Sequence, residues 1–267
     1  MYDYVIVGAG SAGCVLAARL TEDPACRVLL LEAGPADRKL EIKIPAAFNK
    51  LFKSRYDWAY ETVPQTHLDG RPRFWPRGKT LGGSSSLNAM MYVRGNREDY
   101  DAWAALGNDG WSYDDVLPYF RRSENFERGA TAERGAGGPL NVAELRDRNA
   151  TTEAFLRAAQ EVGIPRNDDV NGSEQDGVNA TQVTQKRGRR WSAADAYLRP
   201  ARKRQADGAG GGDRHAEAGR GGDGVVQRLA VERLDHVGDR SAADTHQRWW
   251  DALPASNRSL IPRHAPR

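Results

Sequence analysis

The sequence has few cysteines, no long apolar run and almost no net charge. Its 267 residues include only Cys14 and Cys26, which cannot build a disulfide framework or a zinc site. The apolar run 28–31 ends at Glu32, far short of the roughly 18 residues that a membrane span needs, so no transmembrane segment is predicted. A net charge of +3 does not favour nucleic acid as the main partner. Met1 leads directly into a strand-like pattern without a signal peptide, and we therefore expect a cytoplasmic protein.

The end of the chain is poor in apolar side chains. Residues 202–267 contain 11 residues of the set Leu, Ile, Val, Met, Phe, Trp, Tyr and Cys, whereas the equally long stretch 1–66 contains 25. Glycine-rich runs in this tail cannot bury enough apolar area to offset backbone ordering, so the tail is predicted to be largely disordered. It is either a natural flexible basic segment or the product of out-of-frame translation that begins near Arg202. The patternless mixture of Arg, Gly, Ala, Asp and His favours the second interpretation.

The first 32 residues follow the order of a dinucleotide-binding unit. The apolar run 4–7 predicts a fully buried parallel strand, and the stretch 11–20 predicts a helix. The run 27–31 predicts a second buried strand that ends at Glu32. Between the first strand and the helix stands a glycine-rich turn, 8–13. Strand, glycine turn, helix, strand and acid are the elements that such a site requires, in the right order.

Each glycine of the turn has a physical role. Gly8 permits the tight turn, Gly10 lets the backbone approach a pyrophosphate, and Gly13 lets the helix pack closely on the strand. Free amides at the start of the helix face the phosphates. Glu32 accepts hydrogen bonds from an adenosine ribose and disfavours NADP by repelling a 2′-phosphate. FAD and NAD share the adenosine diphosphate, so this unit does not choose between them.

A second glycine-rich motif lies at 77–88. It reads Arg-Gly-Lys-Thr-Leu-Gly-Gly-Ser-Ser-Ser-Leu-Asn. Its exposed amides and hydroxyls suit the phosphate and ribityl parts of an extended cofactor, and Arg77 and Lys79 add positive charge. By composition alone, a glycine–serine linker is the competing interpretation.

The stretch 78–101 resembles the first signature of the glucose–methanol–choline (GMC) family of FAD-dependent oxidoreductases. The stretches 1–34, 56–65 and 94–103 resemble the choline dehydrogenase and alcohol dehydrogenase branch. The similarity covers about residues 1–201 and then stops abruptly. The resemblance implies an α/β fold, with a Rossmann-like FAD-binding domain built on a parallel sheet and part of an α+β substrate domain.

The resemblance also implies domains and a set of cofactor-binding residues. The FAD-binding domain would occupy 1–140, a partial substrate domain 141–201, and the tail 202–267. A histidine that attaches flavin covalently in some relatives falls at Leu87, so bound FAD would be non-covalent. No catalytic or metal-binding residue is assigned. The residues implied for cofactor binding are Gly8, Gly10, Ser11, Ala12, Gly13, Glu32, Ala33, Arg77, Gly82, Gly83, Ser84, Asn88 and Met91.

The activity implied for an intact relative is oxidation of a choline-like or aliphatic primary alcohol by hydride transfer to flavin. The family's active-site histidine lies near the C-terminus of chains about twice this length, so we expect this chain to be inactive alone. The alternative is a non-catalytic, truncated remnant that only binds nucleotide, and a nicotinamide-dependent dehydrogenase is a third. The alcohol, the electron acceptor and the oligomeric state are left open.

Local patterns also predict the surroundings of two side chains and several further elements. Cys14 is expected to be a small buried hydrophobe, and His67 is expected to be a solvated side chain. Further predictions are a capping box at Ser112 and Asp115, an amphipathic helix over 151–162 with Phe155, Leu156, Ala159 and Val162 on one side, a strand-like stretch over 178–184, and a short helix capped by Ser192 and Asp195 that ends before Pro200.

Overall fold

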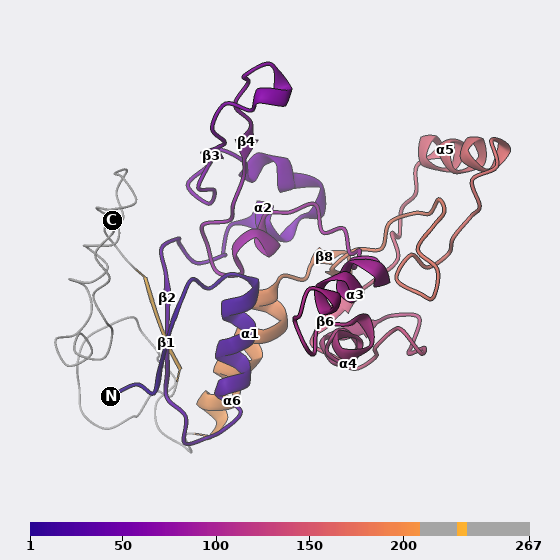
Figure 1. Cartoon of the computed structure of the whole chain (residues 1–267). Coiled ribbons are helices and arrows are strands. Elements are labelled where there is room, and N and C mark those ends of the chain that lie inside the picture. The colour runs from indigo at the N-terminus through magenta and orange to yellow at the C-terminus, as the bar shows by residue number, and fades with distance from the viewer. Residues whose placement is uncertain (209–228, 234–267) are drawn as a thin grey trace. The chain divides into compact units, whose positions relative to one another are not determined.

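The computed structural model describes residues 1–208 and 229–233, which form two compact units (Figure 1). Unit 1 takes Met1–Asp37, Phe52–Ser84 and, among the described residues, 198–208 and 229–233. Unit 2 takes Arg38–Leu51 and Ser85–Tyr197. The functional boundaries predicted at residues 140 and 201 are not tested by this division and stay a prediction.

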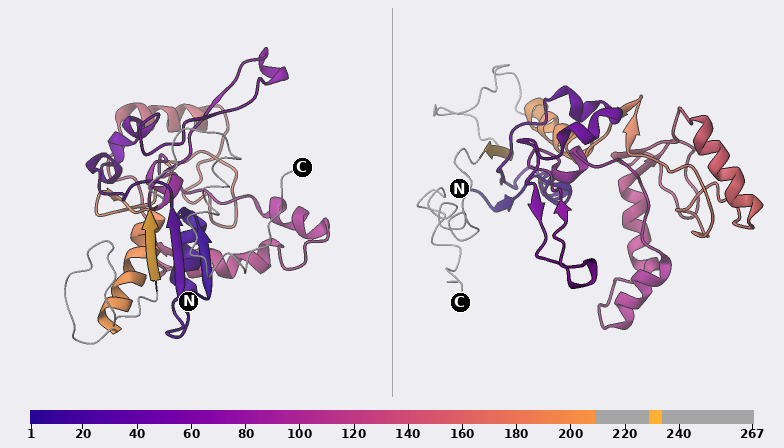
Figure 2. Two further views of the ribbon diagram at one scale, coloured as in Figure 1. Left: turned by 90° about the vertical axis from the view of Figure 1, so that its left-hand side faces the viewer. Right: turned by 90° about the horizontal axis from the view of Figure 1, so that it is seen from above.

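Unit 1 is built on a parallel three-stranded sheet. Its strands are β1 (Tyr4–Val7), β2 (Val28–Glu32) and β9 (Leu229–Arg233), in the order β1–β2–β9. Tyr4 lies opposite Val28 in one ladder, and Val28 lies opposite Leu229 in the other. Figure 2 shows the three strands side by side in its left view. The predicted α/β class with a parallel sheet is confirmed.

The two predicted strands differ in burial. Every residue of β2 is buried, because β2 is the central strand and both of its faces are covered. The prediction that the run 4–7 is fully buried is wrong. Tyr4 is 51 % exposed and Val7 is 58 % exposed, because β1 is an edge strand within the described sheet.

Two helices of unit 1, α1 (Ser11–Leu20) and α6 (Arg199–Gly208), lie side by side (Figure 1). The Arg204 Nη2 donates to the Ala18 carbonyl over 3.0 Å. Arg199 pairs with the buried Asp37 at an Nη2–Oδ1 distance of 2.7 Å. Pro200 is the second residue of α6, so the predicted helix end before Pro200 is wrong. α6 follows directly on a π-helical turn, Ala194–Leu198. The predicted cap of that turn is present, because the Ser192 N–H donates to the Asp195 Oδ2 over 3.1 Å and the Asp195 N–H donates to the Ser192 Oγ over 3.3 Å.

A hairpin completes unit 1. It pairs β3 (Tyr60–Glu61) with β4 (Phe74–Trp75), and a 3-10 turn over Thr66–Leu68 lies between the two strands. His67 is exposed in that turn, as predicted.

Unit 2 is mixed, with helices and short strands. Its parallel pair is β5 (Glu124–Phe126) with β6 (Leu140–Val142), and its antiparallel pair is β7 (Gln185–Lys186) with β8 (Arg189–Arg190). The elements are α2 (Leu40–Lys43), a 3-10 helix (Pro45–Leu51), α3 (Arg97–Ala105), α4 (Tyr113–Ser123), β5 (Glu124–Phe126), β6 (Leu140–Val142), α5 (Ala150–Glu161), β7 (Gln185–Lys186), β8 (Arg189–Arg190) and a π-helical turn (Ala194–Leu198); a further 3-10 turn, Gly83–Ser86, contains the boundary between the units.

Charged groups are buried in the interior of unit 2. Glu124 and Arg134 are both fully buried. Arg134 donates to the Glu124 carboxylate through Nε and Nη2, and Arg94 donates to it through Nη2 over 2.7 Å. Two guanidinium groups therefore satisfy one carboxylate, which joins β5 to the loops that carry Arg94 and Arg134.

Other predicted elements have mixed outcomes. The capping box of Ser112 and Asp115 is present at the start of α4. The helix predicted over 151–162 is α5, but only Leu156 and Ala159 of its predicted apolar side are buried. Phe155 is 67 % exposed. The stretch 178–184 forms isolated bridges at Val178 and Val183 and no strand.

Part of the tail has described structure. Residues 202–208 belong to α6, and 229–233 form β9, which pairs with the central strand of the sheet. The prediction of disorder for the rest of 202–267 falls on residues outside those described, and so does the interpretation as out-of-frame translation. Among the described residues, no helix has the length and apolar character needed to cross a bilayer.

Candidate functional site

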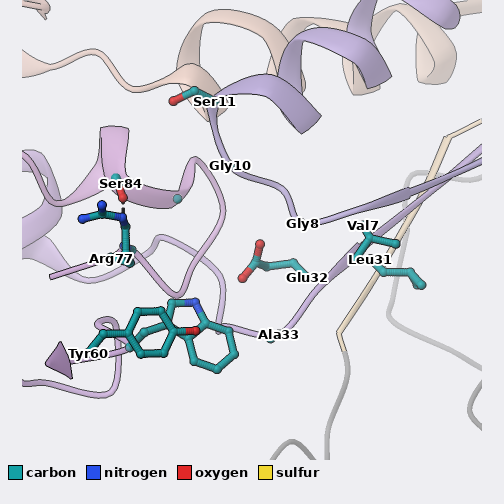
Figure 3. Close-up of a pocket in the computed structure, with 13 residues that line it drawn as sticks. Val7, Gly8, Gly10, Ser11, Leu31, Glu32, Ala33, Tyr60, Arg77 and Ser84 are labelled. Carbon is teal, nitrogen blue, oxygen red and sulfur yellow. Dashed lines mark hydrogen bonds between the residues drawn. The ribbon is translucent and has the colours of Figure 1, made fainter. Parts of the chain in front are cut away.

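A pocket of about 550 Å³ lies within unit 1, where the β1–α1 turn, the end of β2 and the second glycine motif meet (Figure 3). Its volume is in the range of small-molecule sites. The residues that line it are Val7, Gly8, Gly10, Ser11, Leu31, Glu32, Ala33, Trp58, Tyr60, Arg77, Gly78, Gly83 and Ser84.

The β1–α1 turn is tight for two separate reasons. Gly8 has a φ of +90°, which side chains rarely permit. A Cβ on Gly13 would lie 1.9 Å from the Gly8 carbonyl oxygen, so only glycine lets α1 approach the turn this closely. Cys14 is buried beneath the turn, as predicted, and its Sγ donates to the Ala9 carbonyl over 3.3 Å. Burial raises the pKa of this thiol to about 12, so it is not a nucleophile at neutral pH.

The N-terminus of α1 faces the pocket without a capping side chain. Its N-cap is Gly10, which has no side-chain cap, and no acidic residue lies in its first turn. The first helical hydrogen bond runs from the Cys14 N–H to the Gly10 carbonyl. The amides before Cys14 and the positive end of the helix dipole are therefore available to an anion.

Glu32 lies at the end of β2 and is 7 % exposed. Its Oε2 accepts from the Ala9 N–H and its Oε1 from the Gly34 N–H, each over 2.8 Å. Burial raises the pKa of this carboxyl, and the two N–H groups partly oppose that shift. Each oxygen keeps a further lone pair, so the carboxylate can still accept two hydroxyl hydrogen bonds.

The second glycine motif packs directly on the first. The Gly82 N–H donates to the Ala9 carbonyl over 2.7 Å. A Cβ on Gly83 would lie 2.7 Å from the Cα of Gly10, and Gly83 has a φ of +53°. On the other side, a Cβ on Gly34 would lie 1.9 Å from the Lys79 carbonyl oxygen. The motif is thus a packed wall of the pocket, and the linker interpretation is wrong.

An aspartate organises the facing side of the pocket. Asp57 is buried, and its Oδ1 accepts from the Ala59 N–H over 3.0 Å and from the Arg77 N–H over 2.9 Å. The first bond holds the backbone between the pocket residues Trp58 and Tyr60, whose rings stack at a centroid distance of 5.7 Å, and the second holds Arg77 beside them. Figure 3 shows Tyr60 and Arg77 on the side of the pocket opposite Gly8.

The pocket contains eight of the thirteen predicted cofactor residues: Gly8, Gly10, Ser11, Glu32, Ala33, Arg77, Gly83 and Ser84. Ala12, Gly13 and Gly82 belong to the same unit but do not line it. Asn88 and Met91 belong to unit 2. The prediction omitted five residues that line the pocket: Val7, Leu31, Trp58, Tyr60 and Gly78. The aromatic stretch 56–60 could have indicated two of them, Trp58 and Tyr60.

Gly10 provides a test of whether a ligand fits the pocket. Its φ of −72° is open to any residue, and a Cβ placed on it would meet nothing within 4 Å. Neither the backbone conformation of Gly10 nor contact with neighbouring protein atoms requires glycine at this position. The space beside its Cα belongs to the pocket, so glycine at this position suits a ligand that lies against the backbone.

These features define a class: a βαβ unit with a glycine turn, an uncapped helix and a terminal acid is a dinucleotide-binding fold. The model of the GMC oxidoreductase family matches residues 2–208. The chain belongs to the GMC oxidoreductase family.

Named relatives agree with this assignment. The chain is 54 % identical over 211 residues to human mitochondrial choline dehydrogenase, a match that covers 76 % of this chain and 36 % of that protein. It is 50 % identical over 200 residues to an alcohol dehydrogenase (acceptor) of Pseudomonas putida, covering 74 % and 36 %. The crystal structure of pyridoxine 4-oxidase from Mesorbium loti superimposes with a TM-score of 0.75 at 37 % identity, covering 86 % of this chain and 42 % of that one. The chain therefore spans little more than a third of the length of these curated relatives.

Proposed function

We propose that the unit 1 pocket binds the adenosine diphosphate part of a non-covalent FAD, and that the chain provides cofactor binding for the oxidation of an alcohol CH–OH group. The uncapped start of α1 beside the buried acid Glu32 carries this proposal. A solved relative at 36 % identity is an FAD-dependent oxidoreductase from Chaetomium thermophilum, which supports flavin as the cofactor.

Different residues of the pocket would hold different parts of the cofactor. The amides of Ser11 and Ala12 at the start of α1 would hold the diphosphate, because free helix N–H groups and the helix dipole favour negative charge. Glu32 would accept the ribose hydroxyls, and its charge would repel a 2′-phosphate. Arg77 would add positive charge at the opposite wall.

Flavin, when bound, supplies the hydride acceptor for alcohol oxidation. The pocket residues would supply binding, and no catalytic residue is assigned among them. That the chain does not turn over alcohol by itself stays a prediction. The alcohol and the electron acceptor are not assigned, and a cytoplasmic location stays part of the proposal.

Titration of the full chain tests the proposal. Quenching of tryptophan fluorescence, to which Trp58 in the pocket contributes, is measured with FAD, ADP, NAD and 2′-phospho-ADP. We expect FAD and ADP to bind, NAD to bind more weakly than FAD, and 2′-phospho-ADP to bind more weakly than ADP. NAD binding tighter than FAD would support a nicotinamide-dependent dehydrogenase. No response to FAD or ADP would contradict nucleotide binding altogether.

A further inference from the structure

Arg77 brings positive charge to the unit 1 pocket, and its main chain is fixed on both sides. Among the described residues that line the pocket, only Arg77 is a cation. Its N–H donates to the buried Asp57 Oδ1 over 2.9 Å, and its carbonyl accepts from the Trp58 N–H over 2.8 Å. The base of the Arg77 side chain therefore cannot shift unless hydrogen bonds within unit 1 break.

The guanidinium of Arg77 has no acidic partner within the described part of the chain. Its Nη1 donates to the Pro76 carbonyl over 2.8 Å, and its Cζ lies 5.1 Å from the centroid of the Trp75 ring. That distance is within the range of a cation–π contact. A carbonyl and a ring face leave the positive charge uncompensated, and most of the N–H donors of the guanidinium remain for a ligand.

Lys79, a second cation near the pocket, acts on the carboxylate of Glu32. Its Nζ lies 4.3 Å from the centroid of the Trp58 ring, and Lys79 itself does not line the pocket. Its charge partly opposes the rise in the pKa of Glu32 that burial causes. Arg77 is therefore the cation that the pocket offers to an anionic ligand.

The local sequence Trp-Pro-Arg explains how Trp75 reaches the guanidinium. Trp75 is the last residue of β4 and lies opposite Tyr60 in the hairpin. Side chains two positions apart in an extended segment point to the same face, which places residues 75 and 77 together. Pro76 has a fixed φ and restricts the residue before it to extended backbone. The ring and the guanidinium are thus joined by a stiff connection.

Trp75 lies outside the pocket and supports the side chain that enters it. It does not line the pocket, and it is 50 % exposed, so burial uses only part of its ring. Arginine stacks readily on aromatic faces. A long side chain that is free in solution loses rotamer freedom when a ligand binds to it. Because Trp75 already restricts Arg77, much of this loss precedes binding.

We infer that Trp75 is a positioning residue that holds the Arg77 guanidinium ready for the diphosphate of the bound nucleotide. The inference rests on the proposed function and adds to it a residue outside the pocket that the sequence did not single out. Trp75 acts only through Arg77 and needs no contact with the ligand. Its contribution therefore depends on the phosphates and is absent for a ligand that lacks them.

The test compares Trp75→Leu with Trp111→Leu in the full chain. Trp111 is a matched control, because it belongs to unit 2 and is 52 % exposed. Affinities for ADP and for adenosine are measured by calorimetric titration at low and high salt. We expect Trp75→Leu to weaken ADP binding about two- to fivefold at low salt and to leave adenosine binding unchanged. The loss for ADP should shrink at high salt, because salt screens the charge of Arg77. Trp111→Leu should match the wild type.

A second set of variants covers the case in which Trp75→Leu does not fold. Trp75→Phe keeps an aromatic face, so its ADP affinity should be intermediate. Arg77→Met should weaken ADP binding more than either variant of Trp75, and adding Trp75→Phe or Trp75→Leu to it should cause no further loss. Equal losses for ADP and adenosine, additive losses in the double variants, or unchanged ADP affinity in both variants of Trp75 would overturn the inference. Absence of ADP binding by the wild type would overturn the proposed function first, and this inference with it.

Discussion

The first turns of α1 in unit 1 and of α3 and α4 in unit 2 differ in how their N–H groups are satisfied. Asn96 caps α3 and Ser112 caps α4, each in a capping box with an aspartate three residues later. Both helices also carry two acidic residues in the first turn. α1 begins at Gly10 with no side-chain cap and no acid.

The first-turn N–H groups of α3 and α4 are capped by side chains of their own unit, whereas those of α1 are left for a ligand. Side-chain oxygens satisfy the free amides of α3 and α4 and complement the helix dipole, so their ends are purely structural. The end of α1 leaves amides and positive potential directed into a pocket that also contains Glu32. Substitutions at α1 and at the capped helices should therefore affect ligand binding and stability differently.

The largest effect is expected from Gly13→Val, which damages packing and not binding chemistry. Its Cβ would overlap the Gly8 carbonyl, so α1 must move away from the turn. We expect a loss of about 3 kcal/mol or more in the free energy of unfolding. Urea denaturation followed by circular dichroism measures it. A variant as stable as the wild type would show that α1 can shift freely.

Gly10→Val should separate binding from stability. A Cβ there meets nothing within 4 Å, so the free energy of unfolding should stay within about 1 kcal/mol of the wild type. The side chain would fill the space beside the turn and weaken ADP binding about a hundredfold, or roughly 2.7 kcal/mol. Gly10→Ala, with a smaller side chain, should give an intermediate loss. Calorimetric titration with ADP that shows equal affinities would contradict the pocket assignment.

Ser11→Asp gives α1 the acid that α3 and α4 already have. The new carboxylate should stabilise the helix by about 0.5 kcal/mol and weaken ADP binding about tenfold by repelling the diphosphate. Ser11→Asn has a similar shape without the charge and should bind nearly normally. The difference between the two variants should shrink in high salt. Equal ADP affinities at low salt would show that the diphosphate does not lie at this helix end.

Asn96→Ala removes a structural cap. The side chain accepts from the Glu98 N–H over 3.0 Å, so the loss should be about 1 kcal/mol in the free energy of unfolding. ADP affinity should not change, because α3 belongs to unit 2 and the pocket to unit 1. Thermal denaturation and ADP titration together decide this. A change in affinity alone would show that the contrast between the two kinds of helix end is wrong.

The smallest effect is a pH dependence from Glu32. Burial raises the pKa of this carboxyl, and only its ionised form accepts from both ribose hydroxyls. Because its pKa is raised, this group is protonated at a higher pH than an ordinary glutamate, so ADP affinity should fall as the pH is lowered from neutral and recover on return. Glu32→Gln should bind more weakly at neutral pH and lose most of this dependence. An affinity that rises on acidification would have the wrong sign for this role.

Local patterns predicted the βαβ unit and its glycine turn, because Gly8 and Gly13 act through contacts with near neighbours in sequence. The sequence could not predict that β1 is an edge strand of the sheet formed by the described residues, or that β9 pairs with β2, because strand order depends on residues far along the chain. The tail was judged by composition, which does not detect a single five-residue strand.

The candidate site shows the same limit. The glycine and acid positions were readable from spacing, whereas Trp58 and Tyr60 enter the pocket only because Asp57 fixes their backbone by accepting N–H groups from its own turn and from Arg77.

The parallel ladder between β2 and β9 joins residues about 200 positions apart, which makes it one of the slowest kinds of contact to form. During translation, β1, α1 and β2 leave the ribosome long before α6 and β9 have been synthesised. The side of β2 that pairs with β9 therefore stays without that partner until residues 229–233 have been synthesised. That interval is when a chaperone has a bare strand edge to protect from aggregation.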